Sequence, residues 1–189
     1  CRTAENGAEF AKKIKQQSGI DLEIIDGYEE AVLNLKGALL NVQDEKAGYV
    51  VVYDLGGGST EITLATRSAK PEILHTVSVP WGARNAAEKF GLKEYDPVAA
   101  ARLDEEISAC SRAFVRDSGL EKYRGDVCFV ATSSTPLRLT HIARGWEKYD
   151  RERADGLKVG VDEFERATAK VCAMDCRQMA EDANIGPVR

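Results

Sequence analysis

The chain has 189 residues, of which 43% are hydrophobic and 30% charged, and its formal net charge is −5. This composition is that of a globular protein with one domain or slightly more. The acidic balance argues against a dedicated nucleic-acid-binding protein, which usually carries a basic excess. No apolar stretch approaches the ~20 residues of a membrane span, and no signal-peptide pattern opens the sequence.

Five widely spaced cysteines predict reduced thiols, not a disulfide framework. Together with the absence of targeting signals, this favours a cytoplasmic protein with no membrane association.

The first forty residues predict a helix, a strand and a second helix. Residues 5–17 have apolar side chains at helical spacing, and Gly19 ends this helix. Residues 21–25 predict a short strand, and residues 28–40 predict a helix. The apolar face of the second helix consists of Ala31, Leu33, Leu35, Ala38 and Leu39. Glu29 and Glu30 lie in its first turn, where acids complement the helix dipole.

The centre of the chain, residues 49–65, has an apolar run, an aspartate, three glycines and an alternating run. The two runs predict a buried strand and a returning antiparallel strand. Gly56, Gly57 and Gly58 can adopt positive φ and present bare backbone N–H groups, so the turn predicts a phosphate cradle. Asp54 and Glu61 flank it, and two carboxylates beside a phosphate site indicate a divalent cation. A plain β-hairpin is the alternative, although it needs only one or two glycines.

Further elements follow in alternation. Residues 72–79 predict a third strand, and a helix runs to Phe90. Asp96 and Pro97 begin another helix that Gly119 ends. Residues 127–131 predict a fully buried strand, residues 132–135 a small-residue loop, and Pro136 opens a helix to about residue 144. Residues 146–161 predict a loop with weak structure, and helices over 162–174 and 177–182 complete the chain.

From residue 49 onward this order is βββαβα, typical of an α/β, RNase H-like lobe with a mixed sheet, as in the actin, Hsp70 and sugar-kinase superfamily. Those proteins bind phosphates between two such lobes. We therefore expect residues 1–42 to be the C-terminal remnant of a first lobe and residues 43–189 a second lobe with its last helices truncated. Because the first residue is Cys1 and not Met, we expect a piece of a longer protein.

Several motifs resemble the exopolyphosphatase/guanosine pentaphosphate phosphohydrolase (Ppx/GppA) family. The central motif is DLGGGSTEI, residues 54–62. Residues 2–10 are similar to the family's R-x-A-x-N-x-x-x-F, residues 23–31 to its E-V-I-S-G-x-E-E-A, and residues 78–84 to its S-L-P-x-G-A-x-R. Residues 131–135 lie where the family has a small, usually glycine-rich loop. These matches run in the family's order over nearly the whole chain.

The resemblance implies a hydrolase that cleaves terminal phosphoanhydride bonds of inorganic polyphosphate or guanosine pentaphosphate with Mg²⁺ or another divalent cation. Glu30 matches the catalytic base that activates water, and Glu61 and Asp54 match carboxylates tied to metal and water. The phosphate-binding residues it implies are Gly56, Gly57, Gly58, Ser59, Thr60 and Arg2. The family also suggests a homodimer. The sequence does not choose between the two substrates.

Departures from the family pattern keep other functions open. Val32 stands where the family has arginine, and Thr132, Ser133 and Ser134 replace a glycine-rich turn. The family's first phosphate loop is absent, so we expect this chain alone to be inactive. A non-catalytic phosphate or nucleotide sensor of the same fold is the first alternative. An actin-like kinase or chaperone lobe is the second, although Glu30 followed by Asp54 suits a hydrolase better.

Overall fold

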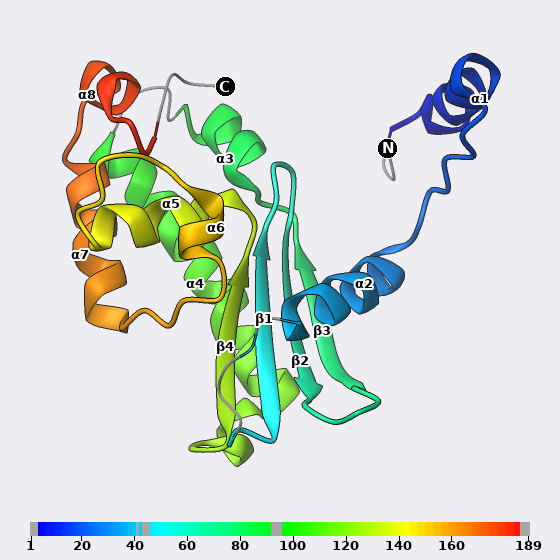
Figure 1. Cartoon of the computed structure of the whole chain (residues 1–189), viewed down its shortest axis with the longest axis horizontal. Helices are drawn as coiled ribbons and strands as arrows, with labels where there is room; N and C mark the ends of the chain where they lie inside the picture. The colour runs from blue at the N-terminus through cyan, green and yellow to red at the C-terminus, as the bar shows by residue number, and fades with distance from the viewer. Residues whose placement is uncertain (1–3, 41, 43–45, 92–95, 186–189) are drawn as a thin grey trace.

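A four-stranded mixed sheet forms the centre of the computed structural model, which describes residues 4–40, 42, 46–91 and 96–185 (Figure 1). The strands are β1 (Tyr49–Leu55), β2 (Thr60–Thr66), β3 (Ile73–Val79) and β4 (Val127–Thr132), in the order β3-β2-β1-β4. β2 is antiparallel to β1 and β3, and β4 is parallel to β1. The sheet confirms the predicted RNase H-like order.

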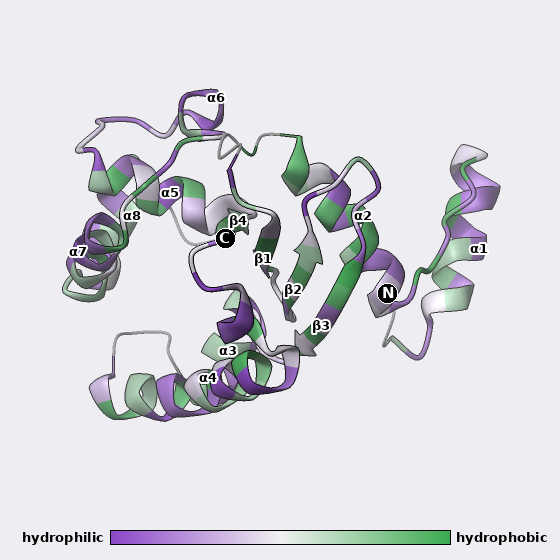
Figure 2. Cartoon of the chain, turned by 90° about the horizontal axis from the view of Figure 1, so that it is seen from below, coloured by the Kyte–Doolittle hydropathy of each residue, from purple (hydrophilic) through white to green (hydrophobic). Residues whose placement is uncertain are grey.

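Helices cover both faces of the sheet (Figure 2). α2 (Gly27–Leu39) lies on one face, and α4 (Pro97–Ser118) lies on the other beside α3 (Ala83–Phe90). The 3₁₀ helix η1 (Leu120–Tyr123) precedes β4. Beyond β4 lie α5 (Ser134–Ala143), α6 (Arg151–Ala154), α7 (Val161–Cys172) and α8 (Cys176–Glu181). α1 (Gly7–Ser18) lies apart from the rest of the molecule.

Alternating strand residues divide the core into two clusters, one under each helical layer. On the α2 face, Val50 and Val52 pack with Leu35 and Ala38 of the helix. On the α4 face, Val51 and Leu64 pack with Phe114. Because Ala31, Leu35 and Ala38 are all buried, the rotation of α2 about its own axis is fixed against the sheet.

Local signals set both ends of α4 and the C-terminal end of α1 as predicted, whereas α5 begins at Ser134 and not at Pro136. Asp96 caps α4 by accepting hydrogen bonds from the backbone N–H groups of Val98 and Ala99, and Pro97 is its first residue. Gly19 and Gly119 adopt the left-handed conformation that ends α1 and α4.

The structure contradicts several predictions about buried surface. Residues 21–25 form no strand, because no described strand lies beside them to complete a hydrogen-bonded ladder, and Leu22 and Ile24 are exposed. Leu33 points away from the sheet and is also exposed. β4 is not fully buried, since it lies at the edge of the described sheet and Phe129 is 70% exposed. The loop predicted over 146–161 contains α6.

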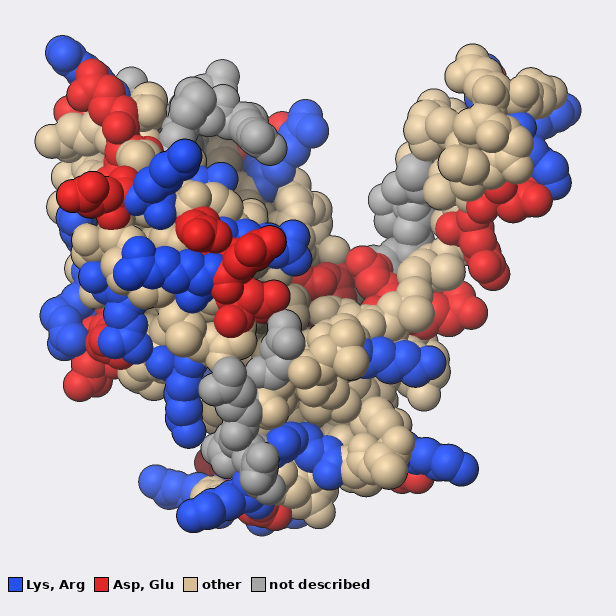
Figure 3. Space-filling view, in the orientation of Figure 1, with Lys and Arg blue, Asp and Glu red and all other residues tan. Residues whose placement is uncertain are grey.

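Two further predictions concern membrane-spanning helices and cysteines. Among the described residues, no helix is long and apolar enough to cross a membrane. Cys110, Cys128 and Cys172 form no disulfide bond within the described part of the chain. On the face shown in Figure 3, basic and acidic side chains are interspersed over the surface.

Candidate functional site

A row of polar side chains crosses all four strands at one level of the sheet. Strand register places Asp54 opposite Glu61 on β2 and opposite Thr132 on β4, and it places Glu61 opposite Ser78 on β3. Directly opposite residues project from the same face. Asp54 follows Val50 and Val52 at alternate positions, so the row lies on the α2 face, beyond the apolar cluster.

Hydrogen bonds fix both carboxylates of this row. Glu61 is 3% exposed, and the hydroxyl of Ser78 donates to its Oε1 at 2.9 Å. Asp54 is half-buried, and its Oδ2 accepts a hydrogen bond from Nδ2 of Asn34 on α2 at 3.0 Å. At the end of the row, Oγ1 of Thr132 is buried with no hydrogen-bond partner among the described residues. A buried unpaired hydroxyl is costly, and here it adjoins the carboxylates.

α2 contributes Glu30, which lies one turn before Asn34 and therefore on the same helix face. Glu30 is half-buried. The neighbouring Glu29 has a different role, because its Oε2 accepts from the backbone N–H of Asp26 at 3.2 Å while Asp26 caps the helix in return. Glu29 thus completes a capping box, and capping does not account for Glu30.

Val32, the residue that departs from the family pattern, lies on another side of α2. It lines a cavity of about 370 Å³ with Lys36, Pro71 and Glu72, at the turn between β2 and β3. The cavity therefore lies at the end of the sheet opposite to the carboxylates, since β2 runs from Thr60 beside Glu61 to Thr66 beside that turn.

The glycine-rich turn between β1 and β2 is fastened by its carbonyl groups to the start of α3. The carbonyl oxygen of Gly56 accepts from the N–H of Ala83 at 2.9 Å, and that of Gly57 accepts from the N–H of Arg84 at 2.9 Å. The carbonyl of Gly58 accepts from Nδ2 of Asn85 at 2.7 Å. Gly82 permits this approach, because a Cβ there would lie 2.5 Å from backbone atoms of the turn.

These hydrogen bonds leave backbone N–H donors along the opposite edge of the turn. In a planar trans peptide the C=O and the following N–H point in opposite directions. With three successive carbonyls directed at α3, the N–H groups of Gly57, Gly58 and Ser59 are directed away from it. No described residue accepts a hydrogen bond from these three groups. Such an array of backbone donors is suited to an anion.

The glycines of the turn are not needed for positive φ, which is the reason that the sequence predicted. None of Gly56, Gly57 and Gly58 has a φ in the left-handed region, so the expectation of positive φ was wrong. A Cβ at Gly57 or Gly58 would have no atom within 4 Å. Neither backbone conformation nor protein packing therefore demands these two glycines, and their bare surface leaves open space beside the donors.

Thr60, one of the predicted phosphate contacts, is not joined to the cluster. The hydroxyl of Thr60 donates to the carbonyl of Trp81 at 2.6 Å, on the α4 face of the sheet. In the same region burial raises the pKa of Tyr53, an effect that its hydrogen bond with Thr60 partly offsets. Arg2 lies outside the described residues. Ser59 stays at the turn, where its carbonyl accepts from the N–H of Gly56 at 3.0 Å.

Asp54 and Glu61 have the chemistry of a magnesium site. Mg²⁺ is commonly bound through one or two carboxylates together with substrate phosphates and water. A cross-strand pair beside an anion cradle fits that description. No group of three or more His, Cys, Asp or Glu side chains suited to a metal occurs in the described ranges, so the two carboxylates would need oxygen ligands from the substrate or solvent.

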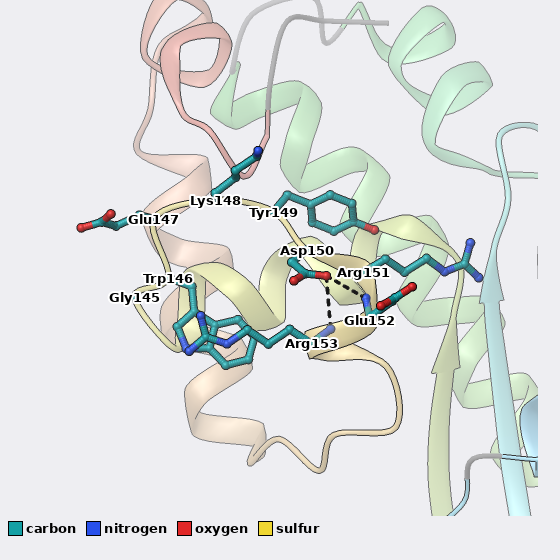
Figure 4. A pocket seen from close by; sticks show the side chains of 9 residues that line it. All are labelled: Gly145, Trp146, Glu147, Lys148, Tyr149, Asp150, Arg151, Glu152 and Arg153. Atoms are coloured by element: carbon teal, nitrogen blue, oxygen red, sulfur yellow. Dashed lines mark hydrogen bonds between the residues drawn. The ribbon is translucent and has the colours of Figure 1, made fainter.

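A larger cavity, of about 830 Å³, lies in the loop after α5 and is lined by residues 145–153 (Figure 4). The guanidinium of Arg153 stacks on Trp146 at 3.8 Å, and Asp150 caps α6. Buried His141 holds the loop in place, since its Nε2 accepts a hydrogen bond from the N–H of Asp150 at 2.8 Å. These contacts explain Trp146, Asp150 and Arg153 as packing and capping residues.

Sequence reasoning missed Asn34 and Ser78, which hold the two carboxylates, and Thr132 as part of the row. The spacing of four between Glu30 and Asn34 was a usable signal for a shared helix face. The position of Ser78 opposite Glu61 depends on strand register, and the sequence alone does not give that pairing.

Comparisons with known proteins show which family and which solved structures the chain is similar to. The Ppx/GppA phosphatase family matches residues 1–181. A bifunctional 3-dehydroquinate synthase/phosphatase from Fusobacterium nucleatum is 33% identical over 155 residues, which cover 80% of this chain and 22% of that protein. The chain thus spans about a fifth of the length of this curated relative.

Solved structures share the fold. An exopolyphosphatase-like protein has a TM-score of 0.79 at 23% identity, covering 98% of this chain and 57% of that one. An exopolyphosphatase from Cytophaga hutchinsonii has a TM-score of 0.78 at 20% identity, covering 97% and 58%. With the family match extending over nearly all its length, the chain belongs to the Ppx/GppA phosphatase family.

Proposed function

We propose that the protein hydrolyses terminal phosphoanhydride bonds of inorganic polyphosphate, guanosine pentaphosphate or both. One observation carries this proposal: a pair of fixed carboxylates, Asp54 and Glu61, lies beside a turn whose backbone donors are open to an anion. Family membership supports the reaction class.

Phosphoryl transfer needs positioning and charge neutralisation more than covalent chemistry. The N–H groups of Gly57, Gly58 and Ser59 would bind oxygens of the phosphate chain. Asp54 and Glu61 would hold Mg²⁺, which neutralises charge on the phosphates when bound.

Glu30 is the proposed general base. One carboxylate must accept a proton from the attacking water and direct it at the phosphorus atom. The shared helix face of Glu30 and Asn34, which contacts Asp54, supports this proposed role.

The matched pair Glu30→Gln and Glu29→Gln tests the assignment in the natural protein that contains this chain. Glu30→Gln should reduce phosphate release by roughly 10²- to 10⁴-fold, the usual contribution of a general base. Glu29→Gln should remain within about twofold of the wild type, because glutamine also completes a capping box. Phosphate release is measured with both substrates and Mg²⁺. Full activity of Glu30→Gln would refute the base assignment.

The sensor function remains the alternative, and the same measurements separate it from the hydrolase. A wild-type protein that binds polyphosphate or guanosine pentaphosphate in equilibrium binding experiments, yet releases no phosphate, would be a sensor. One observation favours this alternative: Ser133 is a non-glycine residue with a φ of 81°, in a loop where the resemblance implies glycine.

A further inference from the structure

Asn34 is the residue of α2 that reaches the polar row of the sheet. Its Nδ2 donates to Oδ2 of Asp54 at 3.0 Å across the interface between helix and strand. The neighbouring Leu35 is 2% exposed, and Ala31 and Ala38 are also buried. Asn34 is thus held at the interface by the packing of the residues around it.

An asparagine at this place is unfavourable for the helix alone. Asparagine is a poor helix former, because its side chain competes for backbone hydrogen bonds. Here the amide does not form a cap or a local turn. Its partner lies 20 positions away on another element. The hydrogen bond therefore holds α2 in position against β1.

The bond has two geometric consequences. It restrains the side-chain rotation of Asp54 by occupying one oxygen. It also joins the helix face that carries Glu30 to the strand that leads into the glycine-rich turn. Since α2 is a rigid element over one turn, restraint at Asn34 extends to Glu30.

We propose that Asn34 is a positioning residue: it orients Asp54 for metal binding and aligns Glu30 with the carboxylate pair. This inference rests on the proposed function, because it assigns Asn34 a part in that site. Asn34 acts through Asp54 and Glu30 and does not itself touch the substrate.

The test compares Asn34→Leu with the matched control Lys36→Leu in the natural protein that contains this chain. Leucine has the same number and branching of side-chain heavy atoms as asparagine and is a better helix former, so both variants should fold. Lys36 is exposed on the same helix. Three quantities are measured: Mn²⁺ affinity by isothermal titration calorimetry, kcat and KM for phosphate release, and the thermal unfolding midpoint.

For Asn34→Leu we expect Mn²⁺ affinity and kcat each to fall about tenfold, the usual effect of losing a hydrogen bond to a charged group. KM should change by less than about twofold and the unfolding midpoint by only a few degrees. Lys36→Leu should leave all three quantities near those of the wild type. In an Asp54→Asn background, Asn34→Leu should have little further effect, because the pair acts as a unit.

The outcomes distinguish this inference from the proposed function. If the wild type releases no phosphate but Asn34→Leu still weakens Mn²⁺ binding, the proposed reaction fails and the positioning role stands. If Mn²⁺ affinity is absent in the wild type or unchanged in Asn34→Leu, the positioning role is overturned. The positioning role is also overturned if the thermal unfolding midpoint falls sharply together with activity, since that would show a purely structural role.

Discussion

Ser133 has backbone angles of φ 81° and ψ −176°, a region occupied almost only by glycine. It joins β4 to α5, next to Thr132 in the polar row. Its side chain makes no capping hydrogen bond to α5 that would offset the strain. Glycine would adopt these angles without cost.

Ser133→Gly should therefore increase the free energy of unfolding by about 1 kcal/mol, the relief of strain less the added entropy of glycine in the unfolded chain. Urea denaturation measures the difference. Ser133→Ala is the control, since alanine keeps the Cβ and should give no such gain. Equal stabilities of the glycine and alanine variants would show that the backbone at residue 133 is not strained.

Individual residues also show where sequence reasoning reaches its limit. The pair Glu29 and Glu30 could be placed in the first turn of a helix from the sequence. Only the structure separates them, because the bond from Asp26 N–H to Glu29 is a matter of side-chain geometry. The same holds for Thr60, whose hydroxyl is bonded to the Trp81 carbonyl on the opposite face from Glu61.

Among the elements, α3 supports the glycine-rich turn without lying at its open edge. Its first N–H groups donate to the turn carbonyls. Hydrogen bonds in a chain polarise one another, so a carbonyl that accepts a bond makes the N–H of the same peptide a better donor. α3 should therefore strengthen the donors at the open edge of the turn.

The glycines of this region should respond differently to alanine. Gly57→Ala should fold with nearly wild-type stability, because a Cβ there meets nothing within 4 Å, yet it should weaken polyphosphate binding at least tenfold by filling the space beside the donors. Gly82→Ala should lower both stability and binding, because its Cβ would lie 2.5 Å from Gly57 and Gly58 backbone atoms. Thermal unfolding and equilibrium binding are the two measurements. Equal losses of stability in both variants would contradict this account of the turn.

Elements with local signals were predicted well, and an element that depends on distant partners was not. The Asp96-Pro97 start and the Gly119 end of α4 are encoded in neighbouring residues. The strand expected over residues 21–25 had a suitable local pattern, but a strand also needs a partner, and no described strand provides one.

At the scale of the whole molecule, α1 and α2 form a natural comparison. They have 12 and 13 residues, but only α2 buries apolar side chains against the sheet. Isolated helices of this length are marginal in water. In hydrogen-exchange measurements on the 189-residue chain, we expect amides of α1 to exchange much faster than those of α2, which should approach the protection of β1. Equal protection of α1 and α2 would show that α1 has a packing surface on the rest of the chain.

The fold and the candidate site differ in how far the sequence predicts them. The order of elements follows from periodicity and turn residues, and it places Asp54, the glycines and Glu61 together. The contributions of Ser78 and Thr132 come from pairing between strands that are distant in sequence. Side-chain partners such as Asn34 depend further on the rotation of α2, which the packing of the complete core sets.

The row from Thr132 to Ser78 forms only when all four strands pair in the correct register. Successive strand residues face opposite sides, so sliding any strand by one position would replace a polar member of the row with its neighbour from the other face. A slip of β2 would bring Thr60 or Ile62 to the place of Glu61 and bury the carboxylate among Leu64 and Phe114. Misregistered molecules would lose apolar packing and the carboxylate pair in the same event. A partly active, wrongly paired species should therefore not accumulate.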